Sequence, residues 1–133
     1  MKLPSSVEKK KMTPYKVLVV DDEENIRGPI CIALDKLSKG KYQTVEATNG
    51  LEGLEAMRQG RYDALLTDVR MPIMDGVEMI NQAISEDICP PKVLVMTGNG
   101  FEYVKRLREE GLEVITKPFS LRDPIQKLDR LLL

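Results

Sequence analysis

The stretch ALLTDVRMPIMDG, residues 64–76, joins a short apolar run to an acidic residue and then to a turn. Residues 63–67 have the length and composition of a buried strand, and Asp68 follows them directly. Pro72 and Gly76 are typical of the turn that comes after such a strand. The stretch therefore predicts a buried strand that presents a carboxylate at its tip.

Similar apolar runs occur elsewhere in the chain and alternate with longer segments of helical periodicity. Ile26, Ile30 and Leu37, for example, recur at the spacing of one helical face. A chain that alternates strands and helices in this way forms a parallel sheet with right-handed crossovers and helices on both faces. The sequence predicts an α/β doubly wound (βα)5 fold with strands at residues 16–20, 43–48, 63–67, 92–96 and 113–116.

The predicted helices carry start and stop signals. A short polar residue followed three positions later by an acid is typical of a helix start. This pattern occurs at Asn49 with Glu52, Asp75 with Glu78, Asn99 with Glu102, and Ser120 with Asp123. Gly40, Gly60 and Gly111 stand where a left-handed residue would end a helix. Pro29 lies inside the first helix and removes a backbone donor, so we expect a local irregularity there.

The length of the chain indicates one domain. Its 133 residues are enough to bury a substantial core. We expect a flexible, lysine-rich N-terminal tail at residues 1–15 and a single domain at residues 16–133. Cys31 and Cys89 lie in apolar surroundings, have no C-x-x-C spacing and have no histidine with which to share a metal. Both are therefore expected to be small core residues, without a disulfide or a zinc site.

Charge and hydropathy argue against two classes of partner. The formal net charge of -1 gives no overall attraction to nucleic acid or to an anionic membrane. The apolar runs are far shorter than the roughly 18 residues that a membrane span needs, and the first residues lack the apolar core of a secretory signal. We therefore expect a cytoplasmic protein that binds neither nucleic acid nor a membrane.

Polar residues follow four of the five predicted strands. Asp21 and Asp22 follow the first strand, Asp68 the third, Thr97 the fourth and Lys117 the fifth. Each residue alone has an ordinary structural explanation, such as a helix cap, a turn or a solvated side chain. Because ligands of such sheets bind outside the carboxyl ends of the strands, these residues together indicate a functional site.

The residue types at these strand ends suit phosphoryl transfer. Clustered carboxylates repel one another, and a bound cation relieves that repulsion. With oxygen ligands and no histidine, Mg²⁺ is the natural choice. Lys117 would supply a positive charge opposite the metal and Thr97 a hydrogen-bond donor between them. This arrangement fits transfer of a phosphoryl group to Asp68 as the nucleophile.

Four motifs carry a family resemblance: VVDDEEN (19–25), TDVRMPIMDG (67–76), MTG (96–98) and TKPF (116–119). In this order and at this spacing, residues 16–132 resemble the receiver domain of two-component response regulators, of the chemotaxis-regulator type. The resemblance implies a flavodoxin-like, five-stranded parallel sheet with strand order 2-1-3-4-5. It also implies a signalling function in which Asp68 accepts a phosphoryl group from the phosphohistidine of a sensor histidine kinase or a phosphotransfer protein.

The resemblance assigns further roles. A receiver catalyses its own phosphorylation and dephosphorylation, so it is not an enzyme acting on an external substrate, and the downstream target protein is unknown. Phosphorylation would switch the face formed by the fourth helix, fifth strand and fifth helix. The Lys117–Pro118 peptide bond would be cis. In the implied site, Asp22 binds Mg²⁺ directly, Asp21 binds it through water, and Asp68 and the backbone carbonyl of Arg70 complete the metal site, while Thr97 and Lys117 contact the phosphoryl group.

Two departures from the family pattern concern signal output. Val114 stands three positions before Lys117, where the family usually has an aromatic residue that swings inward on phosphorylation. The segment from Thr97 to Lys117 is about two residues shorter than is typical of the resemblance, so we expect a trimmed fourth helix or trimmed loops. Signal transmission would then depend on the loop TGNGF (97–101), in which Phe101 either moves with the loop or anchors the helix in the core.

Three alternative functions remain open. A flavodoxin-like electron carrier would have a hydroxyl- and glycine-rich loop after its first strand, whereas this chain has DDEEN there. A receiver-shaped interaction module would not use its phosphorylation site. A Mg²⁺-dependent phosphatase with an aspartate nucleophile would have a second acid two positions after Asp68, where Arg70 stands.

Overall fold

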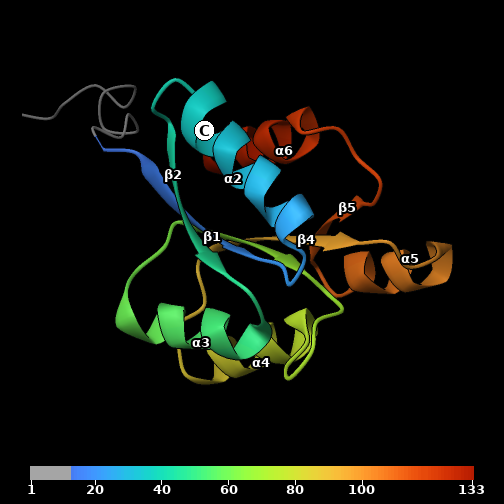
Figure 1. Ribbon diagram of the computed structural model, residues 1–133. Coiled ribbons are helices and arrows are strands. Elements are labelled where there is room, and N and C mark those ends of the chain that lie inside the picture. Colours follow the sequence, from blue (N-terminus) through green and yellow to red (C-terminus); the bar gives the residue numbers. More distant parts are fainter. Residues whose placement is uncertain (1–12) are drawn as a thin grey trace, which may run out of the picture.

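Five short apolar segments form the strands of one parallel sheet (Figure 1). The computed structural model describes residues 13–133. The strands are β1 (Tyr15–Val20), β2 (Tyr42–Ala47), β3 (Ala64–Asp68), β4 (Lys92–Thr97) and β5 (Glu113–Thr116). They lie in the order β2-β1-β3-β4-β5, and every neighbouring pair is parallel. The predicted fold class and strand order are therefore confirmed.

Helices cover both faces of the sheet, as the alternating pattern predicts. On one face lie α2 (Glu24–Leu37) and α6 (Arg122–Leu132), and on the other lie α3 (Gly50–Gln59), α4 (Gly76–Ser85) and α5 (Phe101–Glu109) (Figure 1). The shortest of these five helices is α5, with nine residues. Its length agrees with the prediction that the segment before Lys117 is trimmed.

The core consists of two halves separated by the sheet. Leu18 and Leu65 point toward α3, α4 and α5, whereas Val19 and Leu66 point toward α2 and α6. All four side chains are fully buried. Because successive side chains of a strand point to opposite faces, a strand that is covered on both sides is apolar throughout. This is why the strands read as continuous apolar runs rather than as alternating patterns.

Two of the four predicted helix caps are confirmed. The Asn49 side chain accepts a hydrogen bond from the Glu52 amide, and the Glu52 carboxylate accepts one from the Thr48 amide, which completes a reciprocal capping arrangement. Asp75 likewise accepts a hydrogen bond from the Glu78 amide at the start of α4. These two caps fix the first turns of the helices that follow β2 and β3.

The other two predicted caps are wrong. Helix α5 begins after Gly100, and the Asn99 amide donates instead to the Thr97 hydroxyl. Helix α6 begins after Leu121, and Ser120 contributes only its backbone carbonyl to the turn before the helix. In both cases, the polar residue lies in the loop that leads away from a strand end and forms a different local hydrogen bond in place of the predicted cap.

The predictions for helix ends have mixed outcomes. Gly40 and Gly111 have positive φ angles of 82° and 91°, as predicted. Gly60 ends α3 with its amide bonded to the Ala56 carbonyl, but its φ of -158° is extended rather than left-handed. Helix α2 runs without a break through Pro29, so the irregularity expected there does not interrupt the helix.

The N-terminal boundary is partly outside the described residues. Residues 1–12 of the predicted tail are not among them. The tail prediction is wrong for Tyr15, which is the first residue of β1, pairs with Tyr42 and donates its amide hydrogen to the Lys41 carbonyl. The strand therefore starts one residue earlier than predicted.

The two cysteines are confirmed as apolar packing residues. Cys31 is buried in α2, and Cys89 is half-buried before β4; neither forms a disulfide. Burial raises the pKa of the Cys31 thiol to about 11 and also raises that of Cys89. Both thiols are therefore protonated at neutral pH, as expected for inert structural cysteines.

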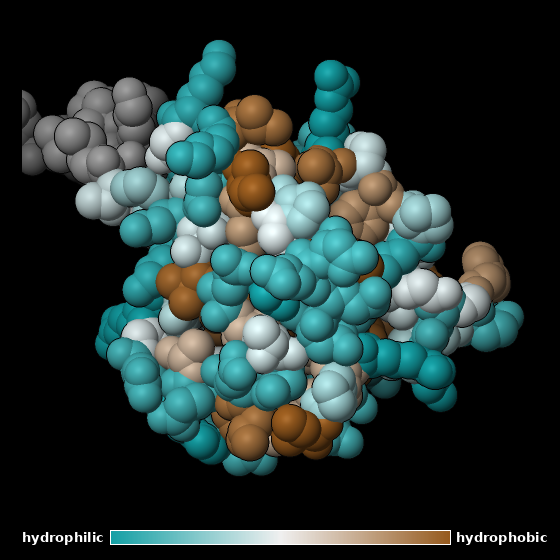
Figure 2. Space-filling model, in the orientation of Figure 1, coloured by the Kyte–Doolittle hydropathy of each residue, from teal (hydrophilic) through white to brown (hydrophobic). Residues whose placement is uncertain are grey.

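Hydrophilic side chains dominate the face shown in Figure 2, where apolar side chains appear as separate groups. Single exposed apolar residues are normal for a globular protein. Among residues 13–133, none of the helices combines the length and apolar composition that crossing a membrane requires.

Ile73 occupies a strained position in the loop after β3. Its φ is 72°, and 75% of the residue is exposed. A left-handed conformation costs an L-residue about 1–2 kcal/mol, whereas asparagine tolerates it. We expect Ile73→Asn to raise the free energy of unfolding in urea by about 1 kcal/mol. Ile84→Asn is the control, because Ile84 is similarly exposed but lies within α4. If Ile84→Asn raised the free energy of unfolding, or if Ile73→Asn did not raise it, the conclusion that Ile73 is strained would be contradicted.

Candidate functional site

The carboxyl ends of β1, β3, β4 and β5 meet at one edge of the sheet. Asp21 directly follows β1, Asp68 is the last residue of β3, Thr97 the last of β4, and Lys117 directly follows β5. The pairing register places Val20 opposite Thr67, Asp68 opposite Met96 and Thr97 opposite Thr116. Parallel pairing in this register brings the predicted residues of four separate segments together.

An acidic cluster lies at this edge. One carboxylate oxygen from each of Asp21, Asp22, Glu23 and Asp68 lies within 4.8 Å of the others. Asp21 is fully buried and Asp68 is 6% exposed, whereas Asp22 and Glu23 are exposed. The cluster therefore has two buried oxygen donors at its base and two exposed ones at its mouth.

Lys117 is the cation that faces the buried acids. Its Nζ lies 3.4 Å from Asp21 Oδ2 and 3.3 Å from Asp68 Oδ1. The Lys117–Pro118 peptide bond is cis, as the resemblance implies. Lys117 thus approaches one oxygen of each acid, Oδ2 of Asp21 and Oδ1 of Asp68. Asp21 Oδ1 accepts a hydrogen bond from the Glu23 amide.

The site shifts the pKa values of its own groups. Burial raises the pKa of Asp68, and the neighbouring Asp21 carboxylate raises it further, against the opposing effect of Lys117. Burial lowers the pKa of Lys117, but Asp21 and Asp68 together outweigh it, so the pKa is raised overall. Lys117 is therefore charged at neutral pH, whereas burial and Asp21 disfavour the charged form of Asp68 in the absence of a bound cation.

The backbone holds Asp68 in place. The Val69 amide donates to Asp68 Oδ1 at 2.9 Å and also lies 3.2 Å from the Met96 carbonyl. The Thr67 hydroxyl donates to the Asp68 carbonyl. Among the described residues, these contacts leave Asp68 Oδ2 without a protein donor, so this oxygen is open to an incoming electrophile or a cation.

Thr97 and Arg70 occupy different positions at the rim. Thr97 is 2% exposed, its hydroxyl accepts a hydrogen bond from the Asn99 amide, and its carbonyl accepts one from the Lys117 amide. The hydroxyl proton of Thr97 remains available to an acceptor outside this pair. Arg70 is exposed, two residues after Asp68, and its side chain has no hydrogen bond or ion pair within residues 13–133.

The oxygen donors of the cluster fit a hard divalent cation. Carboxylates are the ligands that Mg²⁺ and Ca²⁺ prefer, and the chain has no histidine that would favour a softer metal. The close approach of these carboxylate oxygens to one another provides the electrostatic attraction for a cation.

Sequence reasoning missed two residues of this region. Glu23 joins the acidic cluster, and its position directly after the two aspartates was an available signal. Arg27 is 9% exposed and bonds the backbone carbonyl of Asp21. It stands three and seven positions before the buried Ile30 and Leu34, so helical periodicity could have placed it on the buried face of α2.

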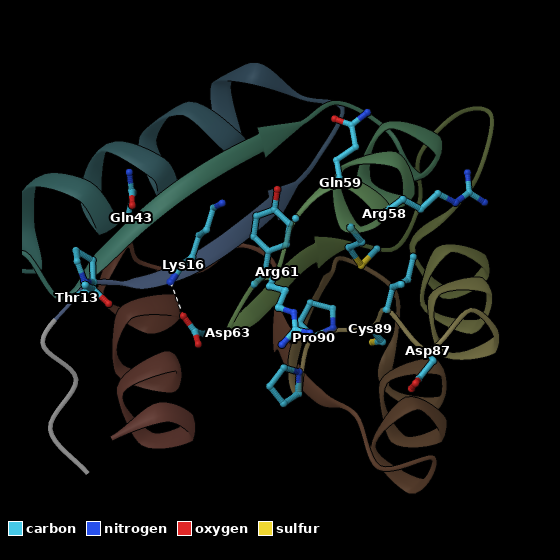
Figure 3. Close-up of a pocket in the computed structure, with 16 residues that line it drawn as sticks. Thr13, Lys16, Gln43, Arg58, Gln59, Arg61, Asp63, Asp87, Cys89 and Pro90 are labelled. Carbon is cyan, nitrogen blue, oxygen red and sulfur yellow. Dashed lines mark hydrogen bonds between the residues drawn. The ribbon is translucent and has the colours of Figure 1, made fainter. Parts of the chain in front are cut away.

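A large open cavity lies at the opposite edge of the sheet (Figure 3). It has a volume of about 1030 Å³ and is lined by residues near the amino ends of the strands, among them Lys16, Gln43 and Asp63. The acidic cluster is not part of it. The chemistry of the molecule is therefore concentrated at the carboxyl edge, and cavity size does not identify the site.

Comparisons with known proteins agree with this arrangement. Residues 17–129 match the family model described as the response regulator receiver domain. Sporulation initiation phosphotransferase F of Bacillus subtilis is 36% identical over 124 residues, which cover 87% of this chain and 94% of the relative. The response regulator receiver protein CpdR of Brucella abortus is 29% identical over 122 residues, covering 89% of this chain and 97% of the relative.

Solved structures show the same fold. The chemotaxis response regulator CheY4 of Vibrio cholerae superimposes with a TM-score of 0.77 at 28% identity, covering 90% of this chain and all of that one. The family model extends over nearly the whole described chain, and its match includes every residue of the carboxyl-edge site. This protein therefore belongs to the response regulator receiver domain family.

Proposed function

We propose that this receiver takes a phosphoryl group onto Asp68 from a phosphohistidine. The observation that carries the proposal is the buried Asp68 carboxylate, which lies 3.3 Å from Lys117 Nζ and within an acidic cluster. A carboxylate oxygen of Asp68 attacks phosphorus, the bond between phosphorus and the histidine nitrogen breaks, and the imidazole takes up a proton from water. The product is an aspartyl phosphate on the chain itself.

Each residue of the site has a proposed role in this transfer. Asp21, Asp22 and Asp68, with the backbone carbonyl of Arg70, would hold Mg²⁺, which when bound supplies positive charge for the phosphoryl oxygens. Lys117 supplies charge from the other side. The Thr97 hydroxyl can donate a hydrogen bond to a phosphoryl oxygen, because the Asn99 amide occupies only one of its acceptor positions.

The phosphodonor is proposed to be a sensor histidine kinase or a phosphotransfer protein. Receiver domains interact with proteins of these two kinds. Beside the site, an apolar groove of about 380 Å³ lies between α2 and the loop after β5, and Lys117 is one of its lining residues. Ile26, Pro29 and Phe119 supply apolar surface there. A helix that carries the phosphohistidine would find apolar contacts next to Asp68.

Phosphorylation is proposed to change the face formed by α5, β5 and α6. The ends of β4 and β5 are joined by the hydrogen bond from the Lys117 amide to the Thr97 carbonyl, so a shift at either residue reaches both strands. Val114 is buried and β-branched and cannot exchange a buried pose for an exposed one. Phe101 is 78% exposed, so of the two alternatives for this residue the core anchor of α5 is wrong.

Amide chemical shifts with and without beryllofluoride, a mimic of the phosphoryl group, would test this output face. We expect changes at residues 98–104 and around Val114. Changes confined to the neighbours of Asp68 would show that the signal does not pass through α5 and β5.

Intact-mass spectrometry tests the phosphorylation itself. With MgCl₂ and acetyl phosphate, the wild-type chain should gain the mass of one phosphoryl group, and with EDTA it should gain none. Asp68→Asn should not gain this mass, whereas Asp87→Asn, which changes an exposed acid after α4, should behave as wild type. A wild type that gains no mass with Mg²⁺ would favour an interaction module that does not use the site. The same gain in Asp68→Asn would refute the assignment.

The cytoplasmic location remains a prediction from the sequence.

A further inference from the structure

We infer that Arg27, held by Glu46, is a positioning residue for the metal site: it fixes the peptide group between Asp21 and Asp22 and thereby sets the affinity for Mg²⁺. The inference rests on the proposed function only in taking these two acids as metal-binding groups. It concerns residues that lie outside the acidic cluster itself.

The contacts of Arg27 join three segments at the edge of the site. Its NH1 atom donates to the backbone carbonyl of Asp21 at 2.8 Å, and its Nε donates to Glu46 Oε1 at 2.8 Å. Arg27 lies on α2, Glu46 lies on β2, and Asp21 lies in the loop between β1 and α2. The Asp21 amide is also bonded to the Ala47 carbonyl. The guanidinium therefore ties this loop to both neighbouring elements.

The carbonyl that Arg27 binds belongs to the peptide bond that joins Asp21 to Asp22. A peptide group is planar, so the direction of its carbonyl fixes the relative orientation of the two Cα atoms. The side chain of Asp21 is held separately, by the Glu23 amide and Lys117. The exposed side chain of Asp22 has no hydrogen bond or ion pair within residues 13–133, so its position depends on the backbone.

Burial makes a purely packing role a poor explanation for an arginine at this position. Arg27 is 9% exposed and lies on the face of α2 that also buries Ile30 and Leu34. An apolar residue would fill such a place without the desolvation of a guanidinium, whereas a charged donor gives a directional bond to a carbonyl. Two such bonds from one planar group fix both its own position and that of its acceptor.

If Arg27 positions the metal ligands, its removal should change the Mg²⁺ affinity in the opposite direction to that expected if Arg27 acted only through its positive charge. Arg27 is a positive charge close to acids that would bind a cation, so removing the charge alone would strengthen Mg²⁺ binding. If Arg27 positions the Asp21–Asp22 peptide, removing it weakens binding despite the lost charge. Arg27→Met therefore distinguishes the two by sign. Arg27→Lys keeps the charge but cannot form both bonds with the same geometry.

Isothermal titration with MgCl₂, without any phosphodonor, measures the affinity directly on the full chain. We expect Arg27→Met and Arg27→Lys each to weaken Mg²⁺ binding by about tenfold, the usual effect of losing a group that orients a metal ligand. Glu46→Gln should cause a smaller loss. Adding it to Arg27→Met should cause no further loss, because Glu46 acts through Arg27.

A matched control separates positioning from loss of stability. Lys41 and Asp129 form an ion pair at 2.9 Å near the start of β2, at the other edge of the sheet. Lys41→Met should lower the free energy of unfolding but leave Mg²⁺ affinity unchanged. Amide chemical shifts of Asp22 and Glu23 in the absence of Mg²⁺ should change in Arg27→Lys and not in Lys41→Met.

Unchanged affinity in Arg27→Lys, or tighter binding in Arg27→Met, would overturn the inference. If Arg27→Met does not fold, Arg27→Lys and Glu46→Gln decide the question, and wild-type affinity in both overturns it. The proposed function fails separately. A wild type that binds Mg²⁺ in an Arg27-dependent way but is not phosphorylated would leave this inference standing and refute phosphoryl transfer.

Discussion

Lys117→Met is expected to slow the phosphorylation of Asp68 by acetyl phosphate about 10²–10³-fold at saturating Mg²⁺. Lys117 Nζ lies 3.3 Å from Asp68 Oδ1 and 3.4 Å from Asp21 Oδ2, so it is the one cation of the described residues that is paired with these two acids. Methionine retains most of the side-chain volume and removes the charge. The variant therefore tests electrostatic stabilisation of the transferring group rather than packing.

The rate can be followed by intact-mass spectrometry at fixed times. Lys92→Met is the control, because Lys92 is exposed at the start of β4, at the far end of the strand that leads to Thr97. It should react at the wild-type rate. If Lys117→Met also reacts at that rate, Lys117 does not take part in the transfer.

The same substitution has an expected effect on pH dependence without Mg²⁺. Burial and Asp21 raise the pKa of Asp68 above its ordinary value of 3.8, and Lys117 opposes this. An acid whose pKa is raised by folding stabilises the protein while protonated, and this stability is lost as pH rises through the raised pKa. The contribution of Asp68 to the free energy of unfolding should therefore fall as pH rises from 3.8 through its raised pKa, and this fall should be larger in Lys117→Met than in the wild-type chain. Equal slopes would show that Lys117 does not compensate Asp68.

Gly76→Ala should lower the free energy of unfolding by about 3 kcal/mol or more. A Cβ at this position would overlap the backbone carbonyl oxygen of Asp68 and lie 3.2 Å from Val69 Cα. The Gly76 amide is bonded to the Val69 carbonyl at 2.7 Å, so α4 cannot move away without losing this bond. The backbone of Asp68, the proposed phosphoryl acceptor, must shift instead.

Urea unfolding followed by circular dichroism measures this effect. Gly28→Ala is the control, since a Cβ there meets nothing within 4 Å and alanine favours the interior of α2. It should raise stability by up to about 1 kcal/mol. A Gly76→Ala variant as stable as wild type would mean that the first turn of α4 does not pack against Asp68 as described.

The sequence predicted the elements that local patterns determine. The five strands are within one residue of prediction at each end, because burial on both faces makes them continuous apolar runs. The strand order came from the family resemblance and not from the pattern of residues. Asn49 and Asp75 were predicted correctly because their caps involve only the first turn of their own helix.

The errors have two physical causes: a competing local hydrogen bond for Asn99, and contacts between separate segments for Arg27. The Asn99 amide bonds the Thr97 hydroxyl at the strand end, so α5 begins later than its capping pattern predicts. Arg27 was missed because its acceptors lie in the loop after β1 and on β2, which local periodicity does not relate to one another. Local patterns likewise could not predict the distances from Lys117 Nζ to Asp21 and Asp68, because these depend on the parallel pairing of separate strands.

The most direct test of the central claim is chemical trapping of the phosphorylated residue. The chain is treated with acetyl phosphate and Mg²⁺, reduced with sodium borohydride and analysed by peptide mass spectrometry. Borohydride reduces an aspartyl phosphate to homoserine, whereas it leaves a serine or threonine phosphate intact. The account predicts homoserine at position 68 and at no other position. Homoserine at Asp21 or Asp22, or a stable phosphate on Thr97, would contradict it.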